Sequence, residues 1–301
     1  MIMKYACTAL LGALLICVML VRADWIEFSS AGTDKNLSLR GRLFKPDGDG
    51  PFAAVVLLHG CSGLGQGGVA QQVEFAWAKR FQEWGYVALA VDSFMPRGLP
   101  EGVRTLPDAK RLSSSRRTND AYGALDYLRA QPFINPEKIA VVGWSNGGVA
   151  VLNTMNLDLH ADRKHGFVSG VTFYPECGLD YGKWRVTRQC GDSGSVTSSK
   201  GVYQPIAALL ILSGEADDWT PAQYCKSMVD AAKSQDYPLE LIMYPGAHHS
   251  FDGGGNYFYI AGASNINKCN ACCGGTVGGN NAATEDAIQQ VKVFLLKHFL
   301  N

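Results

Sequence analysis

The chain has 301 residues, of which 47% are hydrophobic and 18% charged, and its 27 basic residues balance its 27 acidic residues. These values are ordinary for a globular protein and allow one large α/β domain or two small domains. No basic stripe, basic arm or basic amphipathic helix is present, so we expect neither nucleic acid nor a membrane surface as a partner.

Residues 1–23 have the features of a secretory signal peptide. Lys4 supplies a positive start, residues 5–21 are almost wholly apolar, and Ala23 offers a small residue at the −1 position of a cleavage site. The apolar run is close to the lower bound of about 17 residues for crossing a bilayer, so an uncleaved anchor is the less favoured alternative. Cleavage would leave 25 basic and 27 acidic residues, a net charge of −2. We expect residues 24–301 to form a single exported domain.

Strand and helix patterns alternate along this mature chain. Residues 25–45 have the pattern of two antiparallel strands with a turn near Thr33. Five short apolar runs then fit buried parallel strands: 52–58, 85–91, 139–142, 207–212 and 239–244. Apolar residues at helical spacing mark helices around 121–128 and 288–299, whereas the Gly- and Asn-rich segment 252–281 is predicted to be a long surface loop. This order predicts an α/β fold in which a mostly parallel central sheet carries helices on both faces.

A tight turn follows the third of these strands. The sequence GWSNG occupies residues 143–147, and a helical pattern begins near Val149. Glycines at 143 and 147 avoid collisions in so sharp a reversal, which would place the Ser145 hydroxyl in a strained conformation at the carboxyl edge of the sheet. The N-terminus of the following helix favours negative charge at the same place. Ser145 is therefore a predicted nucleophile, and the alternative is a bystander serine in a Gly-rich turn.

A serine nucleophile needs a base and an acid, and two later segments that follow predicted strands supply them: LSGEADDWTP at 212–221 and YPGAHHSFD at 244–252. Because the carboxyl ends of parallel strands meet at one edge, these segments should lie beside Ser145, in the chain order that such hydrolases use. Either Asp217 or Asp218 could be the acid, the other serving as a turn or cap residue, and we favour Asp217. We favour His249 over His248 as the base.

The segment LLHGCSGLG, residues 57–65, ends the strand 52–58 and turns through glycines. Such a loop can offer a backbone N–H to a tetrahedral intermediate, so we expect an oxyanion hole made by the N–H groups of Cys61 and Asn146. Cys61 as the nucleophile is a less favoured alternative. Phe94 and Trp219 are predicted apolar walls of the substrate pocket, and Arg97 is its predicted cation. The predicted chemistry requires no metal and no cofactor.

Nine cysteines raise the question of disulfides or metal. Cys7 and Cys17 would leave with the signal peptide, so an odd number of seven remains. In an exported chain, Cys177 and Cys190 are the easiest pair to bond, and Cys225 could meet one of the remaining group: Cys269, Cys272 and Cys273. The C-x-x-C spacing of that group could alternatively hold zinc, but no fourth ligand lies nearby at a usual spacing.

The assembled motifs resemble the dienelactone hydrolase family of the α/β-hydrolase fold. The resemblance extends from about residue 41 to residue 299 and includes these segments: VVLLHGCSGLG, ALAVDSFMPRG, DAYGALDYLRAQPFINPEKIAVVGWSNGG, LSGEADDWTP and YPGAHHSFD. It implies Asp217 as the acid and His249 as the base. The founding enzymes use cysteine where this chain has Ser145. Their accompanying glutamate corresponds to Gly60.

The substrate residues of that family are only partly present. Of the two arginines that hold a substrate carboxylate, one corresponds roughly to Arg97 and the other to Asp252, where an acid would repel a carboxylate. We therefore expect a secreted serine carboxylester hydrolase that acts on small neutral esters. The alternatives are a dienelactone-type lactonase, a polyester hydrolase like the cutinases, which share a Gly-Trp-Ser turn, an acyltransferase or peptidase using the same triad, and a non-enzymatic binding protein.

Overall fold

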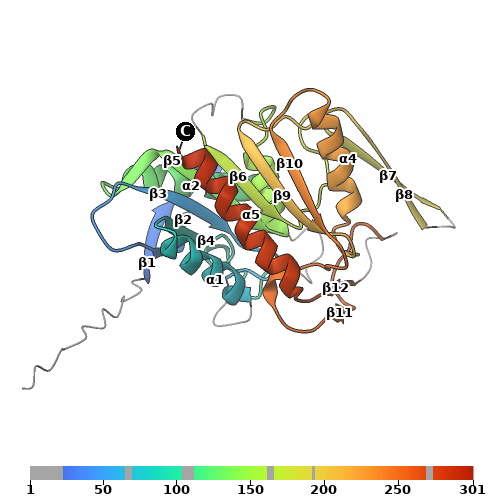
Figure 1. Ribbon diagram of the computed structural model, residues 1–301, viewed down its shortest axis with the longest axis horizontal. Coiled ribbons are helices and arrows are strands. Elements are labelled where there is room, and N and C mark those ends of the chain that lie inside the picture. Colours follow the sequence, from blue (N-terminus) through green and yellow to red (C-terminus); the bar gives the residue numbers. More distant parts are fainter. Residues whose placement is uncertain are drawn as a thin grey trace, which may run out of the picture.

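An eight-stranded sheet forms the centre of the chain (Figure 1). The computed structural model describes residues 23–64, 70–103, 112–160, 166–191, 194–268 and 274–300. In spatial order the strands are β1 (Ala23–Ser29), β2 (Ser38–Phe44), β4 (Val87–Asp92), β3 (Phe52–Leu58), β5 (Ile134–Trp144), β6 (Ser169–Phe173), β9 (Ala208–Gly214) and β10 (Leu239–Tyr244). β1 and β2 pair antiparallel at one edge and every pair from β4 onward is parallel, which confirms the predicted fold class.

Helices cover both faces of this sheet, with α2 (Ser114–Arg129), α3 (Asn146–Thr154) and α4 (Ala222–Lys233) on one face and α1 (Ala70–Glu83) and α5 (Asn281–Leu300) on the other (Figure 1). In β3, Ala54, Val56 and Leu58 pack with the first group, whereas Val55 and Leu57 pack with the second. Both sets are fully buried, which is why the strand is an unbroken apolar run. None of the helices in the described ranges is both long enough and apolar enough to cross a membrane.

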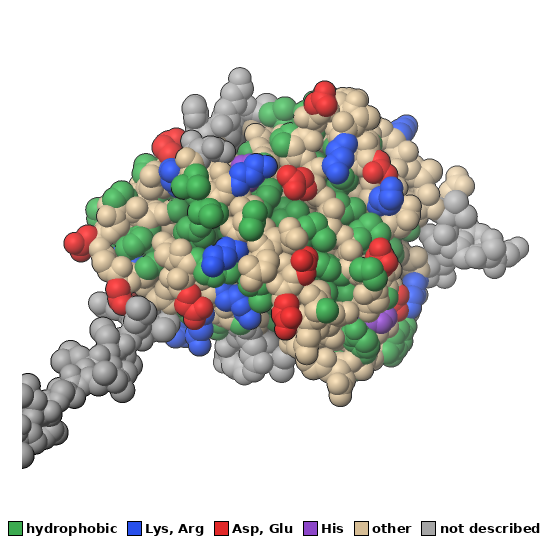
Figure 2. Space-filling view, in the orientation of Figure 1, with side chains coloured by type: hydrophobic (Ala, Val, Ile, Leu, Met, Phe, Trp, Pro, Cys, Tyr) green, Lys and Arg blue, Asp and Glu red, His purple; other side chains and the backbone are tan. Residues whose placement is uncertain are grey.

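The surface agrees with the balanced composition. Figure 2 shows acidic and basic side chains interspersed over the described part of one face, without a gathering of one sign.

The strands 52–58 and 239–244 have the predicted bounds, and β4, β5 and β9 lie within a few residues of their predictions except at the start of β5, which begins at Ile134. The sequence analysis missed β6, whose sequence SGVTF interrupts its apolar residues with Ser, Gly and Thr although all five are buried. It also missed the hairpin of β7 (Arg185–Gly191) and β8 (Gly194–Lys200), which is largely polar.

The segment 252–281 is more ordered than the predicted surface loop. It begins within a short 3-10 helix from Phe251 to Gly253, and its described residues include an antiparallel ribbon of β11 (Phe258–Ile260) and β12 (Gly275–Val277). The ribbon is attached to the His249 segment, because Val277 forms an isolated bridge with His249 and the Gly278 N–H donates to the His249 carbonyl at 3.1 Å.

The disulfide differs from the predicted one. Cys177 bonds to Cys225 across a sequence separation of 48, and both residues are fully buried between the loop after β6 and the inner face of α4. The proposed pairing of Cys177 with Cys190 is therefore wrong, as is a pairing of Cys225 with the last cysteine group. Cys190 lies instead in β7, so its nearness in sequence misled the prediction. Residues 1–22, within the predicted signal peptide, and the remaining cysteine group at 269–273 lie outside the described residues.

Removing this disulfide should destabilise the protein. A Cys177→Ser/Cys225→Ser double variant releases a 48-residue loop constraint on the unfolded chain, and we expect a loss of about 2–4 kcal/mol in the free energy of unfolding. Denaturant unfolding with and without reductant measures it. A Cys61→Ser variant is the control, because Cys61 takes no part in this bond. A peptide map of unreduced protein that joins Cys177 to Cys190 would contradict the assignment.

Candidate active site

Ser145 lies on the turn between β5 and α3 in a conformation that few residues other than glycine adopt. Its φ is 53° and its ψ is −114°, and its N–H donates to the carbonyl of Phe173 on β6 at 2.9 Å. The two flanking glycines have no room for a side chain. A Cβ on Gly143 would lie 2.3 Å from the carbonyl oxygen of Gly147, and one on Gly147 would lie 1.9 Å from that of Leu58. The close crossing of backbone segments thus imposes the strain at Ser145.

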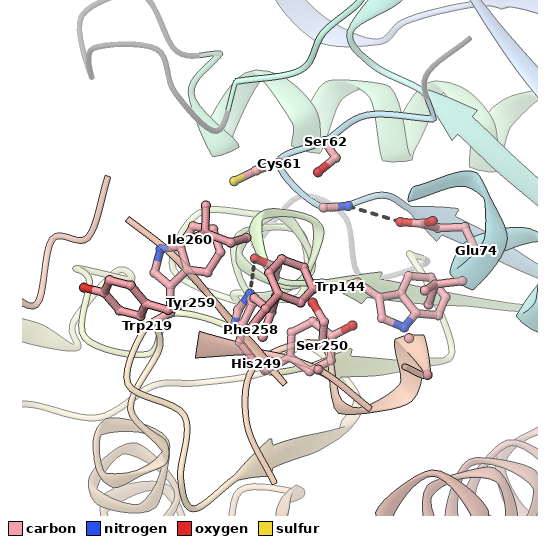
Figure 3. Close-up of a pocket in the computed structure, with 18 residues that line it drawn as sticks. Cys61, Ser62, Glu74, Trp144, Trp219, His249, Ser250, Phe258, Tyr259 and Ile260 are labelled. Carbon is pink, nitrogen blue, oxygen red and sulfur yellow. Dashed lines mark hydrogen bonds between the residues drawn. The ribbon is translucent and has the colours of Figure 1, made fainter. Parts of the chain in front are cut away.

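A continuous chain of hydrogen-bonding groups joins Ser145 to His249 and Asp217 (Figure 3). The His249 Nε2 atom lies 2.9 Å from the Ser145 Oγ atom, and its Nδ1 atom lies 2.8 Å from the Asp217 Oδ2 atom. His249 is 2% exposed and Asp217 is 4% exposed. This arrangement can deprotonate the serine through one imidazole nitrogen while the carboxylate orients the other.

The Asp217 carboxylate is held by the loop that follows β9. Its Oδ1 accepts hydrogen bonds from the backbone N–H groups of Trp219 at 2.9 Å and Thr220 at 2.8 Å, and its Oδ2 lies 2.8 Å from the Thr220 hydroxyl. The imidazole of His249 is flanked by the rings of Tyr174 and Trp219, with ring centroids 4.7 and 4.9 Å away. These contacts restrict the ring to one orientation and keep water from the acid–base pair.

The alternative acid and base have other contacts. The exposed Asp218 accepts hydrogen bonds from the Thr276 N–H at 2.6 Å and the Thr276 hydroxyl at 3.1 Å, and so ties β12 to the acid loop. The His248 ring packs against Tyr257, with centroids 4.6 Å apart. The structure therefore brings Asp217 and His249 to Ser145.

The two predicted oxyanion segments lie next to Ser145. Cys61 and Gly60 border the same cavity as Ser145, and a Cβ on Gly60 would lie 3.7 Å from the Ser145 Cβ. Asn146 is the first residue of α3. Backbone of the loop after β3 and of the α3 N-terminus is thus available near the serine hydroxyl.

Arg117 connects these two segments, and the sequence analysis missed it. Its Nη1 donates to the Asn146 side-chain oxygen at 2.6 Å and its Nη2 to the His59 carbonyl at 2.8 Å. Burial lowers the pKa of Arg117 to about 10, so the guanidinium stays charged at neutral pH. Burial, followed by the charge of Arg117, lowers the pKa of His59 well below its usual value, so that imidazole is neutral. A signal existed, because Arg117 continues the apolar helical stripe of Ala121, Ala124 and Leu128.

A cavity of about 670 Å³ opens over Ser145 (Figure 3). It is bordered by Gly60, Cys61, Ser62, Val73, Glu74, Trp144, Ser145, Tyr174, Trp219, His249, Ser250, Gly253, Gly254, Phe258, Tyr259, Ile260, Val277 and Gly278. In Figure 3, Trp219 and Glu74 lie at opposite ends, with the bond between His249 and Ser145 between them. The Trp219 end is apolar and includes the β11–β12 ribbon.

Of the three predicted substrate residues, Trp219 borders the cavity, whereas Phe94 and Arg97 do not. Phe94 is almost wholly buried in a small cluster that it forms with Val103 and Leu112. Both Nη atoms of Arg97 lie 2.8 Å from the carboxylate of Asp120, and one of them also bonds to Asp34. The assignment of Phe94 and Arg97 to the pocket is therefore wrong, because local packing and ion pairs use both side chains.

Asp252 also differs from its expected role. Its Oδ2 accepts hydrogen bonds from the indole N–H groups of Trp77 and Trp144, both at 2.9 Å, and its Oδ1 from the Tyr174 hydroxyl at 2.7 Å. Burial raises the pKa of this carboxyl, and the three donors oppose that shift. Asp252 is absent from the described cavity wall, so it fixes aromatic side chains rather than facing a substrate.

Comparisons with known proteins agree with this architecture. The sequence model of the prolyl oligopeptidase family matches residues 73–260, a span that contains Ser145, Asp217 and His249. A probable dipeptidyl-aminopeptidase B of Grosmannia clavigera is 26% identical over 243 residues, which cover 74% of this chain and 23% of that protein. A probable 2-oxo-3-(5-oxofuran-2-ylidene)propanoate lactonase of Bradyrhizobium is 23% identical over 77% of this chain and 84% of its own length. The chain thus spans about a quarter of the first relative and most of the second.

Two similar solved structures are hydrolases. A putative dienelactone hydrolase of Klebsiella pneumoniae has a TM-score of 0.60 at 14% identity, with 91% of this chain and 99% of that chain covered. Esterase 2 of Thermogutta terrifontis, phosphoramylated by tabun, has a TM-score of 0.59 at 19% identity, with 90% and 94% covered. The predicted resemblance to dienelactone hydrolases is therefore confirmed at the level of the α/β-hydrolase fold. The model of the prolyl oligopeptidase family matches more than half of the length of this chain, so the chain belongs to that family.

Proposed function

We propose that this hydrolase cleaves small neutral carboxylic esters through a covalent acyl-enzyme on Ser145. The observation that carries the proposal is the hydrogen-bonded sequence from Ser145 through His249 to Asp217. The three residues come from three strand ends, and the strained turn presents the serine hydroxyl to the cavity. Such a constellation needs neither a metal nor a cofactor for acyl transfer.

In the first half of the reaction, His249 Nε2 accepts the proton as the Ser145 Oγ attacks the ester carbonyl. The Asp217 carboxylate stabilises the resulting imidazolium through Nδ1. N–H groups of Cys61 and Asn146 stabilise the tetrahedral oxyanion, with Arg117 holding their two segments together. The imidazolium then protonates the leaving alcohol. In the second half, the same nitrogen takes a proton from a water molecule as its oxygen attacks the acyl carbonyl. The bond between the carbonyl carbon and Ser145 Oγ then breaks, the imidazolium returns its proton to Oγ, and the carboxylic acid is released.

The choice of esters is supported by the relatives whose own length this chain largely covers. Those are a probable lactonase, which by its name opens a cyclic ester, and structures named as esterases. A peptidase is the second candidate, because the matching family model is that of prolyl oligopeptidases. Dipeptidyl amides and short esters, assayed side by side, separate the two. Cleavage of the amides alone would favour the peptidase.

Export is part of the proposal. The disulfide between Cys177 and Cys225 fits an oxidising compartment, and the predicted signal peptide supplies the route. N-terminal sequencing of the protein recovered outside the cytoplasm should give Asp24 as the first residue.

Ser145→Ala should abolish turnover and labelling. A serine-directed organophosphonate forms a covalent bond with an activated Oγ, so intact-mass spectrometry should show one adduct on the wild type and none on the variant. Ser227→Ala, on the exposed side of α4, is the control and should be labelled like the wild type. Full hydrolysis by Ser145→Ala would refute the nucleophile.

Asp217→Asn should lower kcat by about 10³–10⁴-fold, because an amide cannot stabilise the imidazolium and favours the wrong tautomer. The adjacent Asp218→Asn variant is its matched control. Asp218 bonds Thr276 rather than His249, so we expect kcat to change by less than about tenfold. Steady-state kinetics on one ester compares them, and the reverse ranking would move the acid to Asp218.

Neutral acyl groups should be preferred over acyl groups that bear a carboxylate. None of the described cavity residues is Lys or Arg, and Arg97 is already paired with Asp120, so a buried carboxylate would stay uncompensated. Each kcat/KM is divided by the rate constant for hydrolysis of the same ester by hydroxide. We expect the resulting value for 4-nitrophenyl butyrate to exceed that for 4-nitrophenyl hemisuccinate by about tenfold or more. A preference for the hemisuccinate would contradict the neutral class.

A further inference from the structure

The cavity has two unlike ends, and the proposed reaction decides which part of an ester lies at each. His249 Nε2 must protonate the leaving alcohol, so the alcohol lies on the His249 side of the bond that breaks at Ser145. In Figure 3, Phe258 and Trp219 are both close to His249, whereas Glu74 lies away from it. The cavity wall near His249 therefore contacts the alcohol part of the ester.

A row of three residues leads from the base to the outer edge of this wall. Val277 of β12 forms a parallel bridge with His249 and pairs with Phe258 in the antiparallel ribbon. Directly paired residues of neighbouring strands project to the same face, and all three residues border the cavity. Neighbouring strands lie about 4.8 Å apart, so the backbone of Phe258 lies about 10 Å from that of His249. The row is therefore long enough to contact a large substituent on the alcohol.

Phe258 has the most exposed side chain of three consecutive exposed aromatic residues, at 60%. Its two neighbours have other contacts. The Tyr257 ring packs against His248, with centroids 4.6 Å apart, and the Tyr259 hydroxyl accepts a hydrogen bond from Lys268 at 2.9 Å. Because more than half of the Phe258 side chain is in contact with water, an apolar group that covers its ring removes apolar surface from water.

Trp219 supplies a second aromatic wall, and its indole is held in place. Its Nε1 donates to the carbonyl of Ser264 at 2.9 Å. A Cβ on Gly275 would lie 2.8 Å from the Cβ and Cγ atoms of Trp219, so this glycine lets the indole lie directly against the ribbon. Gly275 pairs with Ile260, which lies on the same face of β11 as Phe258. Trp219 and Phe258 therefore offer two apolar surfaces on one face of the ribbon.

We propose that Phe258 and Trp219 form a subsite for the leaving alcohol and select esters whose alcohol carries a large apolar group, above all an aromatic ring. The inference rests on the proposed ester hydrolysis and specifies its substrate class. The ring packs against the two aromatic side chains while the alcohol oxygen lies at His249 Nε2, and packing between aromatic rings adds to the effect of burial. The exposure of Phe258 leaves this end of the cavity open, so the alcohol can depart and water can enter there.

The test compares esters that carry a phenyl group on one side of the ester bond or on the other. Ethyl butyrate is the reference, 2-phenylethyl butyrate carries the ring on the alcohol, and ethyl 4-phenylbutyrate carries it on the acyl group. The kcat/KM of each phenyl ester is divided by that of ethyl butyrate, and this ratio for the wild type is divided by the ratio for Phe258→Ala. The quotient removes the intrinsic reactivities of the esters. We expect about 3–10 for the ring on the alcohol and about 1 for the ring on the acyl group.

Tyr257→Ala is the matched control, because it removes the adjacent exposed ring, which is not among the described residues of the cavity wall. Its quotient should be about 1 for both phenyl esters, and Phe258→Tyr, which keeps the ring, should behave like the wild type. A quotient of 1 for 2-phenylethyl butyrate in Phe258→Ala, or an equal quotient for ethyl 4-phenylbutyrate, would overturn the inference. Absence of hydrolysis of all three esters by the wild type would instead refute the proposed function.

The acyl-enzyme gives a readout that a purely structural role of Phe258 would not change. An alcohol in the subsite can attack the acyl carbonyl in place of water. His249 takes the hydroxyl proton, the bond between the carbonyl carbon and Ser145 Oγ breaks, Oγ regains a proton, and a new ester is released. During hydrolysis of 4-nitrophenyl butyrate, added 2-phenylethanol should therefore give 2-phenylethyl butyrate besides butyrate.

The ratio of this ester to butyrate should be about 3–10-fold higher for the wild type than for Phe258→Ala at the same concentration of 2-phenylethanol. With ethanol, which is too small to reach Phe258, the ratio of ethyl butyrate to butyrate should be the same for both proteins. A displaced ribbon would slow hydrolysis and acyl transfer together. Equal ratios for the two proteins with 2-phenylethanol would therefore contradict the subsite.

Discussion

The site depends on one steric constraint, the crossing of backbone segments where β5 turns into α3. The carbonyls of Gly147 and Leu58 occupy the places where side chains of Gly143 and Gly147 would lie. This contact joins the end of β3, the nucleophile turn and the first turn of α3 in one rigid unit. The surrounding backbone holds Ser145 at a positive φ. The hydrogen bond from its N–H to the carbonyl of Phe173 attaches β6 to the same unit. Ser145 and the two segments proposed to form the oxyanion hole are therefore held in place by the fold itself.

Around this unit the protein buries several ionisable groups, which differ in the number of hydrogen bonds that they form. Asp217 and Asp252 each receive three hydrogen bonds besides any from His249, and Arg117 donates to two acceptors. These hydrogen bonds replace the hydrogen bonds to water that the buried groups lose on folding. Glu74 accepts a longer hydrogen bond, at 3.3 Å, from the Gly60 N–H, and its Oε2 atom has no hydrogen-bond partner among the described residues. Glu74 is thus the least well hydrogen-bonded of these four buried groups.

The sequence predicted those parts of the site that local patterns encode. The serine turn, the strand ends and the chain order of Ser145, Asp217 and His249 can all be recognised within short segments, and the same is true of the strands 52–58 and 239–244. Residues whose surroundings come from distant segments could not be placed in this way. The pairing of Arg97 with Asp120 and the meeting of Cys177 with Cys225 depend on the packing of whole helices. Arg117 continues the apolar stripe of its helix, a spacing that indicates burial but not the partners of the guanidinium, and the contact of Glu74 comes from a distant loop.

The attachment of the β11–β12 ribbon has a mechanical consequence. The ribbon supplies Phe258, Tyr259, Ile260 and Val277 to the cavity wall, and it is fastened to the acid loop through Asp218 and to the base through the carbonyl of His249. A force that a bound molecule applies to Phe258 or Val277 is thus transmitted to the two loops that align the imidazole. In the proposed reaction, the fit of a substrate against this wall and the alignment of His249 are therefore coupled, and remodelling the ribbon for a bulkier substrate also changes the rate of proton transfer.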